Sequence, residues 1–165
     1  MSSIPASSQR SRITPLVIRS AVVAAIGGLI FGFDTAVISG ATDTLKDVFH
    51  LSEFGKGFLV AIATIGTIFG AIIGGRLADV YGRRKVLFAI GILYVLGSLG
   101  TAFAPTHLFL LVFRMIGGIG VGMSSVCAPI YTAEIAPAAV RGRLVGLVQF
   151  NIVLGILLAY LSNFI

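Results

Sequence analysis

The stretch GGRLADVYGRRK, residues 74–85, separates two long apolar runs of this chain. One run covers residues 57–75 and the other covers residues 86–104, so each approaches the ~20 apolar residues that a membrane-spanning helix needs. Gly75 and Gly82 permit close backbone approach within the short connection. The pattern therefore predicts two membrane helices joined by a short basic turn.

The composition of the whole chain also indicates a membrane protein. Of its 165 residues, 57% are hydrophobic and 11% are charged, whereas soluble domains contain about 25% charged residues. The net charge of +6 does not indicate nucleic-acid binding, because the basic residues lie in short segments between apolar runs. We therefore expect the lipid bilayer as a partner and no nucleic acid.

Five apolar segments predict an all-α protein with about five membrane spans. The spans are expected at about residues 16–41, 57–75, 86–104, 108–131 and 144–165. Residues 16–165 would then form a partial transmembrane bundle, preceded by a flexible cytoplasmic tail at residues 1–15. A cleaved signal peptide is less favoured for the first segment, because the run exceeds the roughly 7–15 residues of a signal core and contains Asp34.

The lysine and arginine residues predict the orientation of the bundle. The N-terminal segment and the connections after the second and fourth spans carry nine of the 12 basic residues, at positions 10, 12, 19, 76, 83, 84, 85, 141 and 143. The opposite face has only Lys46 and Lys56. Basic residues favour the cytoplasmic side, so we expect a cytoplasmic N-terminus and place Ile165 near the outer side of a plasma or inner membrane.

The spans contain no recognisable set of catalytic or metal-binding side chains. Cys127 is the single cysteine, and His50 and His107 are isolated in the sequence. The sequence therefore predicts no enzymatic activity, no metal and no cofactor.

Small residues recur every four positions within several predicted helices, a spacing that lets helices approach closely in lipid. They are Gly28, Gly32, Ala36 and Gly40 in the first helix, Gly66, Gly70 and Gly74 in the second, and Gly118 and Gly122 in the fourth.

Asp34 lies within an apolar run, GGLIFGFDTAVISG, at residues 27–40. It is two residues past Gly32, so it faces about 200° away from the small-residue stripe. A charge at the bilayer centre costs at least ~3 kcal/mol on insertion scales, and we therefore expect Asp34 to face a polar cavity. Arg114, the other charge well inside a span, is its candidate partner. The pair would serve an ion or substrate pathway, or alternatively act as a structural ion pair.

Two further segments contain paired charges near predicted helix ends. In the basic turn, we expect Asp79 on the buried side and paired with Arg76 or Arg83. In the fourth-to-fifth connection, Pro129 and Pro137 are expected to bend or end the helix. Glu134 and Arg141 flank Pro137, so they should lie on either side of a break.

Together these motifs resemble the major facilitator superfamily, and specifically its sugar porter family. The G-R-L-A-D-x-x-G-R-R pattern at residues 75–84 resembles the superfamily's turn between its second and third helices. The spacing of Arg, Gly, Pro, Tyr and Glu over residues 114–142 resembles the sugar porter pattern, and residues 27–40 resemble the first helix of proton-coupled members.

The resemblance implies roles for individual residues. Asp34 matches the proton-binding carboxylate of symporters, a position that is often Asn in passive facilitators, and Arg114 matches the arginine that biases its protonation. Gln149 matches a glutamine that hydrogen-bonds sugar hydroxyls, and Phe31 matches an aromatic residue near the sugar. The cytoplasmic charge network that closes the inner gate would contain Arg76, Asp79, Arg83, Arg84, Glu134 and Arg141.

The family fold has twelve helices in two halves with the substrate site between them. This chain corresponds to most of the N-terminal six-helix half, so we expect a fragment, or one of two polypeptides, that does not transport by itself. The expected function of the complete protein is sugar uptake by proton symport with alternating access, with a monosaccharide and a proton as partners. A membrane sugar sensor or subunit of the same fold, and a carrier of a non-sugar substrate such as an organic acid, are the alternatives.

Overall fold

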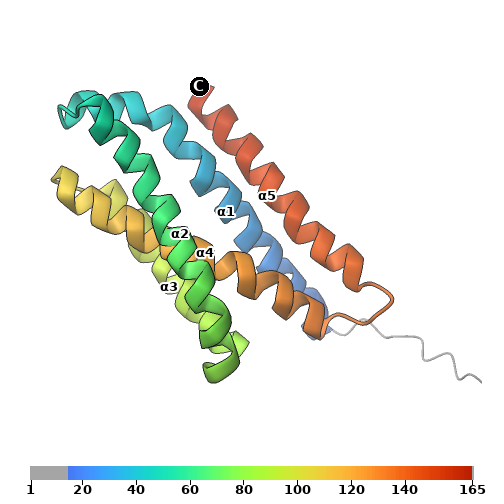
Figure 1. Cartoon of the computed structure of the whole chain (residues 1–165). Coiled ribbons are helices and arrows are strands. Elements are labelled where there is room, and N and C mark those ends of the chain that lie inside the picture. Colours follow the sequence, from blue (N-terminus) through green and yellow to red (C-terminus); the bar gives the residue numbers. More distant parts are fainter. Residues whose placement is uncertain (1–14, 165) are drawn as a thin grey trace, which may run out of the picture.

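The computed structural model describes residues 15–164; residues 1–14 of the predicted tail lie outside this range. The described part contains five helices, α1 (Pro15–Val48), α2 (Glu53–Tyr81), α3 (Arg83–Ala102), α4 (His107–Ile135) and α5 (Arg141–Phe164). Each contains a stretch that is long and apolar enough to cross a membrane. Their connections alternate between the two ends of the bundle (Figure 1). The predicted all-α membrane fold is confirmed.

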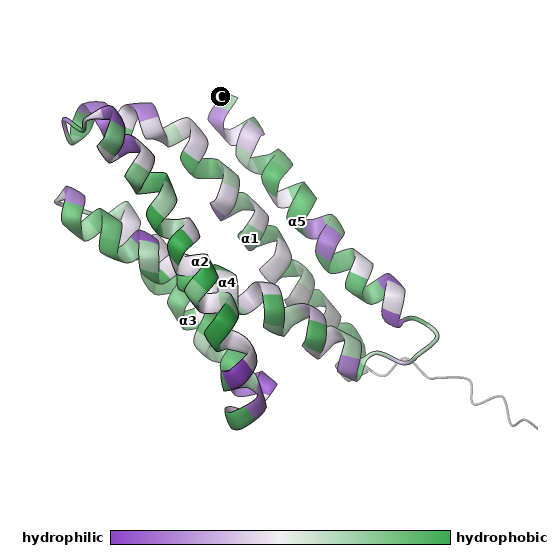
Figure 2. Cartoon of the chain, viewed as in Figure 1, coloured by the Kyte–Doolittle hydropathy of each residue, from purple (hydrophilic) through white to green (hydrophobic). Residues whose placement is uncertain are grey.

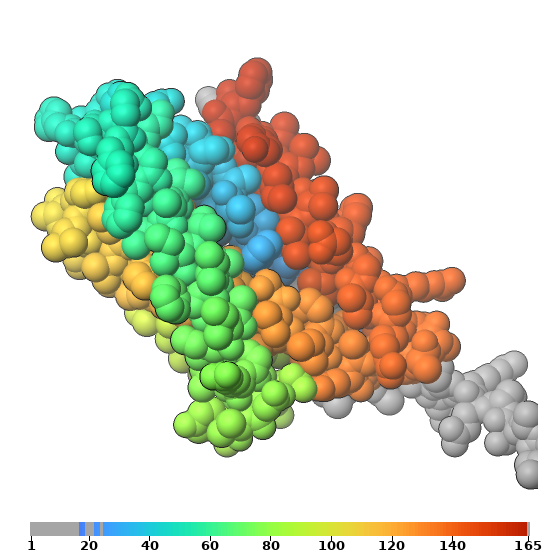
Figure 3. Space-filling view, viewed as in Figure 1, coloured from blue at the N-terminus to red at the C-terminus, as the bar shows by residue number. Residues whose placement is uncertain are grey.

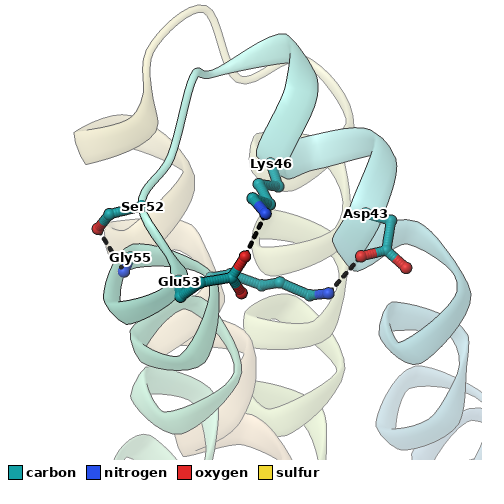
Figure 4. Close-up of polar contacts among 6 residues, drawn as sticks. Asp43, Lys46, Ser52, Glu53 and Gly55 are labelled. Carbon is teal, nitrogen blue, oxygen red and sulfur yellow. Dashed lines mark hydrogen bonds and ion pairs between the residues drawn. The ribbon is translucent and has the colours of Figure 1, made fainter.

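Most helices extend beyond the apolar segments that predicted them, because polar residues stabilise their ends. α1 continues to Val48 and α2 begins at Glu53, where the Ser52 hydroxyl accepts a hydrogen bond from the Gly55 amide over 3.2 Å. Two ion pairs cross between the helices, from Lys46 to Glu53 and from Lys56 to Asp43 (Figure 4). Such exposed pairs contribute little to stability, because water screens their attraction.

The connection between α2 and α3 is a single residue, Gly82, with φ of 88°. This φ lies in a region that side chains disfavour, so glycine is required where the chain reverses direction. The tight turn predicted from residues 74–85 is confirmed.

α4 passes through Pro129 without interruption and ends at Ile135. Of the two effects expected of Pro129, a bend or an end of the helix, the structure contradicts the end, whereas Pro137 does lie in a break between α4 and α5. A residue before proline disfavours the helical conformation, and Ala136 is extended, with ψ of 132°. Glu134 and Arg141 lie on either side of this break, as predicted.

The glycine stripes are the sites of closest helix contact. A Cβ added at Gly70 would meet the carbonyl of Ile119 on α4, and one added at Gly32 would meet the carbonyl of Ile152 on α5. Between α3 and α4, a Cβ on Gly97 would lie 2.7 Å from the Gly117 Cα. α2 and α3 thus pack on α4, and α1 packs on α5. Figure 3 shows the surface of α1 between α2 and α5.

The outer surface of the bundle is apolar over most of its length. Large side chains such as Phe88, Ile68 and Val153 are exposed, and hydrophilic residues gather mainly toward the helix ends (Figure 2). A soluble protein rarely exposes such continuous apolar surface, so this surface fits contact with lipid or with further helices. A buried cluster lies between α2, α3 and α4 and consists of Ala78, Val86, Ile90, Met123 and Cys127.

Candidate functional site

Asp34 lines a cavity of about 370 Å³ between α1, α3 and α4. Arg114 of α4 and Tyr94 of α3 line the same cavity. On the opposite side of α1, Asn163 of α5 donates to the carbonyls of Ala36 and Val37 over 3.5 and 3.3 Å. The small-residue stripe therefore packs on α5 while Asp34 faces away from it, as the helical phase predicted.

Arg114 and Asp34 share this cavity without direct contact. Arg114 is buried, with 7% of its surface exposed, and Asp34 is half-buried. No ion pair within 4.0 Å joins the two among the residues that the structure describes. The Nε of Arg114 also has no hydrogen-bond partner there. The arrangement places a carboxylate and a guanidinium in the lining of one cavity, where their charges still attract.

Phe31 and Gln149 line a second cavity, of about 340 Å³, between α1, α4 and α5. Ser124 and Ser125 add two hydroxyl groups to its wall, and the remaining lining residues are small or apolar. A polyol needs neutral donor and acceptor groups, which the amide and the hydroxyls provide. The structure thus brings together the two residues that the resemblance associates with the sugar.

The two cavities are neighbours because α1 and α4 contribute to both. Phe31 of the second cavity and Asp34 of the first are three residues apart on α1, and residues with this spacing lie close together on a helix surface. A shift of α1 would therefore alter the walls of both cavities.

A charge cluster joins α2, α3 and α4 at the end of the bundle that carries Gly82. The Arg83 guanidinium contacts the Asp79 Oδ1 with Nη2 over 3.3 Å and the Glu134 Oε2 with Nε over 2.7 Å. Asp79 was expected to pair with Arg76 or Arg83, and the structure contains the ion pair with Arg83. Arg83 holds the α2–α3 turn against the last turns of α4.

The expectation that Asp79 lies on the buried side is wrong, since 69% of its side chain is exposed. Ala78 is the buried residue at this point of α2, with 2% exposure, and the next position points about 100° away from it. The other predicted gate residues, Arg76, Arg84 and Arg141, are exposed and form no ion pair within residues 15–164.

Five polar residues of the two cavities were not predicted from the sequence: Tyr94, Ser98 and Thr101 in the first, and Ser124 and Ser125 in the second. All lie within apolar runs and carry no charge, so the search for charged residues in the spans passed over them. The hydroxyl groups themselves, as polar groups within apolar runs, were the signal that could have identified these residues. Within residues 15–164, no group of three or more His, Cys, Asp or Glu side chains could hold a metal ion.

A comparison with protein-family models matches residues 20–165 to the family described as "Sugar (and other) transporter". This chain belongs to that family of transporters. The match covers the two cavities and the Arg83 cluster.

Curated relatives of this sugar transporter family include symporters. The chain is 43% identical to the glucose transport protein of Synechocystis over 94% of its length. It is 40% identical to the arabinose-proton symporter of Bacillus subtilis over 93% of its length and 40% identical to the D-xylose-proton symporter of Escherichia coli K12 over 87%. It covers 33%, 33% and 34% of these relatives, respectively, and so spans about a third of their length.

Solved structures of the same family share the fold. The proton:xylose symporter XylE bound to 6-bromo-6-deoxy-D-glucose superposes with a TM-score of 0.82 and 38% identity, covering 90% of this chain and 37% of that one. The inward open conformation of XylE from E. coli also has a TM-score of 0.82, with 39% identity and coverage of 90% and 39%. The predicted resemblance to the sugar porters of the major facilitator superfamily is confirmed.

Proposed function

We propose that this chain forms the proton site and one wall of the sugar site of a proton-coupled sugar transporter. One observation carries the proposal. Asp34 and Arg114 line one cavity, and Phe31 and Gln149 line its neighbour, with α1 and α4 common to both. The relatives that are named as proton symporters of arabinose and xylose support the same function.

Proton binding would act through the attraction between Asp34 and Arg114. An ionised carboxylate attracts the guanidinium across the cavity, and the guanidinium in turn favours the ionised form. Protonation removes this attraction and lets α1 and α4 change their relative position. Both helices also form part of the wall of the second cavity. Proton binding at Asp34 would therefore alter the contacts that the second cavity offers to a monosaccharide.

The Arg83 cluster would serve as part of a gate on the cytoplasmic side. Arg83 ties the α2–α3 turn to Glu134 near the end of α4, and separating these helices would break the pair. The exposed guanidinium groups at the same end, Arg76, Arg84 and Arg141, are available to carboxylates of the remaining part of the transporter. This assignment follows the predicted orientation, with the N-terminus in the cytoplasm.

The decisive test replaces Asp34 with Asn in the transport-competent protein that carries this chain. Asp34→Asn keeps the size of the side chain but cannot exchange a proton. We expect uphill sugar accumulation to be lost while sugar exchange across the membrane continues. Radiolabelled sugar uptake and counterflow in proteoliposomes measure the two activities separately.

Three results would contradict the proposal. Unchanged accumulation by the Asp34→Asn protein would exclude the coupling role of Asp34. Uptake of organic acids without competition by hexoses or pentoses would indicate a different substrate class. Sugar binding without any flux in the wild-type protein would favour a sensor or a subunit of the same fold.

A further inference from the structure

Ser124 and Tyr94 lie at the boundary between the two cavities. Along α4, the lining of the Asp34 cavity ends at Gly117 and the lining of the Gln149 cavity begins at Ser124. Tyr94 is the first residue of α3 that lines the Asp34 cavity, and Ser124 is the hydrogen-bonding neighbour of its hydroxyl. Two neighbouring hydroxyl groups therefore connect the wall of one cavity to the wall of the other.

Tyr94 is held in place by packing. It contacts the buried cluster between α2, α3 and α4 that includes Ile90 and Met123, and its hydroxyl is inaccessible to solvent. The backbones of α3 and α4 are also close here, since a Cβ on Gly120 would lie 3.7 Å from the Tyr94 amide nitrogen. The Tyr94 hydroxyl is thus enclosed by protein, with Ser124 as the side chain to which it can donate a hydrogen bond.

The Ser124 hydroxyl is not committed to its own helix. Its neighbour Ser125 donates to the Gly122 carbonyl over 2.8 Å, a bond that serine often forms one turn back in a helix. Ser124 makes no such bond within residues 15–164, although it is buried, with 7% exposure. A serine hydroxyl has one donor and two acceptor sites, so Ser124 can accept from Tyr94 and still donate into the second cavity.

We propose that Ser124 contacts the sugar directly and that Tyr94 is a positioning residue for Ser124. The two hydroxyls are not aligned as a hydrogen bond in this conformation. In the sugar-bound protein Tyr94 donates to the Ser124 oxygen, and the Ser124 proton then points to a sugar oxygen. Hydrogen bonds in such a chain strengthen one another. This inference rests on the sugar site proposed at Phe31 and Gln149.

Ser124→Ala should lose one contact with the sugar. We expect the dissociation constant to rise roughly 2- to 13-fold, which is the effect of one neutral hydrogen bond. A monodeoxy sugar without the contacted hydroxyl should bind the wild type more weakly by a similar factor. The same analogue should bind Ser124→Ala as well as the complete sugar does. A purely structural role of Ser124 would weaken all sugars equally and would leave this discrimination intact.

The experiment measures sugar binding to the purified, transport-competent protein that carries this chain, by isothermal titration calorimetry. D-Glucose, D-xylose and L-arabinose are tested first, and the monodeoxy analogues of the sugar that binds most tightly form the series. Ser125→Ala is the matched control, because the Ser125 proton is already donated to Gly122. Support requires that Ser124→Ala loses the discrimination at one sugar position and that Ser125→Ala retains it there.

Tyr94→Phe tests the positioning role separately and keeps the packed ring. Without the tyrosine donor the Ser124 proton is no longer directed to the sugar, so the discrimination should be reduced. In a protein that already carries Ser124→Ala, Tyr94→Phe should have no further effect on sugar binding. Additive effects would show that the two residues act independently and would overturn the positioning role. Tyr160→Phe, at an exposed position outside both cavities, should bind as the wild type does.

The outcomes separate this inference from the proposed function. If Gln149→Ala weakens sugar binding but Ser124→Ala keeps the wild-type discrimination among the monodeoxy sugars, the role of Ser124 is overturned and the sugar site stands. If the wild-type protein binds none of the three sugars, the proposed function is overturned together with this inference.

Discussion

At the scale of single residues, two charged side chains line a cavity inside an otherwise apolar bundle. Asp34 and Arg114 are conspicuous in apolar runs, and helical phase directed Asp34 away from the packing stripe toward a cavity. Tyr94 is not conspicuous, because tyrosine is common where apolar and polar surroundings meet. Its place in the lining of the Asp34 cavity depends on how α3 packs against α4.

Gln149 provides a residue-scale prediction about substrate binding. Gln149→Ala removes one or two hydrogen bonds to sugar hydroxyls, each worth about 0.5–1.5 kcal/mol. We expect KM for the sugar to rise roughly 2- to 150-fold, with an unchanged pH midpoint because Asp34 lies in the other cavity. Initial rates of uptake in the transport-competent protein measure both quantities.

A neighbouring amide on the same helix serves as the control. Asn151 donates to the Leu147 carbonyl of its own helix over 2.8 Å and lines neither cavity, so Asn151→Ala should leave KM nearly unchanged. Equal increases of KM in the two variants would show that Gln149 has no specific role in binding the sugar.

At the scale of helices, the glycine stripes predicted that close contacts exist but not which helices make them. A four-residue spacing defines one face of a helix, and any partner with a complementary face can occupy it. The structure assigns the α1 stripe to α5 and the α2 stripe to α4. Gly118 and Gly122 of α4 form the other side of the α2–α4 contact, because Cβ atoms there would meet the carbonyls of Ala63 and Thr67 on α2.

Gly122 provides an element-scale prediction about stability. In Gly122→Ala the new methyl group would meet the Thr67 carbonyl and lie 2.7 Å from the Ala71 amide nitrogen, so α2 and α4 must separate. Overpacking of this kind costs about 1–3 kcal/mol. We expect a lower melting temperature of the purified protein in detergent, measured by intrinsic fluorescence or by dye-reported unfolding.

Gly91 of α3 is the matched control for this substitution. A Cβ at Gly91 would meet no atom within 4 Å, and alanine is favoured over glycine in helices by about 1 kcal/mol. Gly91→Ala should therefore leave the melting temperature unchanged or raise it. Equal melting temperatures for the two variants would argue against a tight α2–α4 contact at Gly122.

At the scale of the whole molecule, the distribution of charge defines two different ends of the bundle. Arg83, Arg84 and Lys85 begin α3 at one end, whereas Lys46 and Lys56 lie near the α1–α2 connection at the other (Figure 4). An excess of lysine and arginine in short connections favours the cytoplasmic side. The orientation proposed for this bundle depends on this asymmetry.

Cysteine labelling tests the orientation at this scale. The native Cys127 is buried, with 0% exposure, and should not react with a membrane-impermeant maleimide. Exposed positions lie at opposite ends, Ala138 in the α4–α5 loop and Pro105 between α3 and α4. In intact cells we expect labelling of Pro105→Cys only, with Ala138→Cys labelled after the membrane is opened. The reverse pattern would invert the proposed topology.

The sequence by itself determined the apolar spans, the turn at Gly82 and the face on which Asp34 lies. These features depend on composition, local backbone preference and helical period, all of which act over a few residues. Only the tertiary structure decided that Arg83 binds both Asp79 and Glu134, and that α1 and α4 line two neighbouring cavities. These features depend on which helix faces meet, and helices with similar small-residue stripes can meet in several ways until side-chain packing selects one.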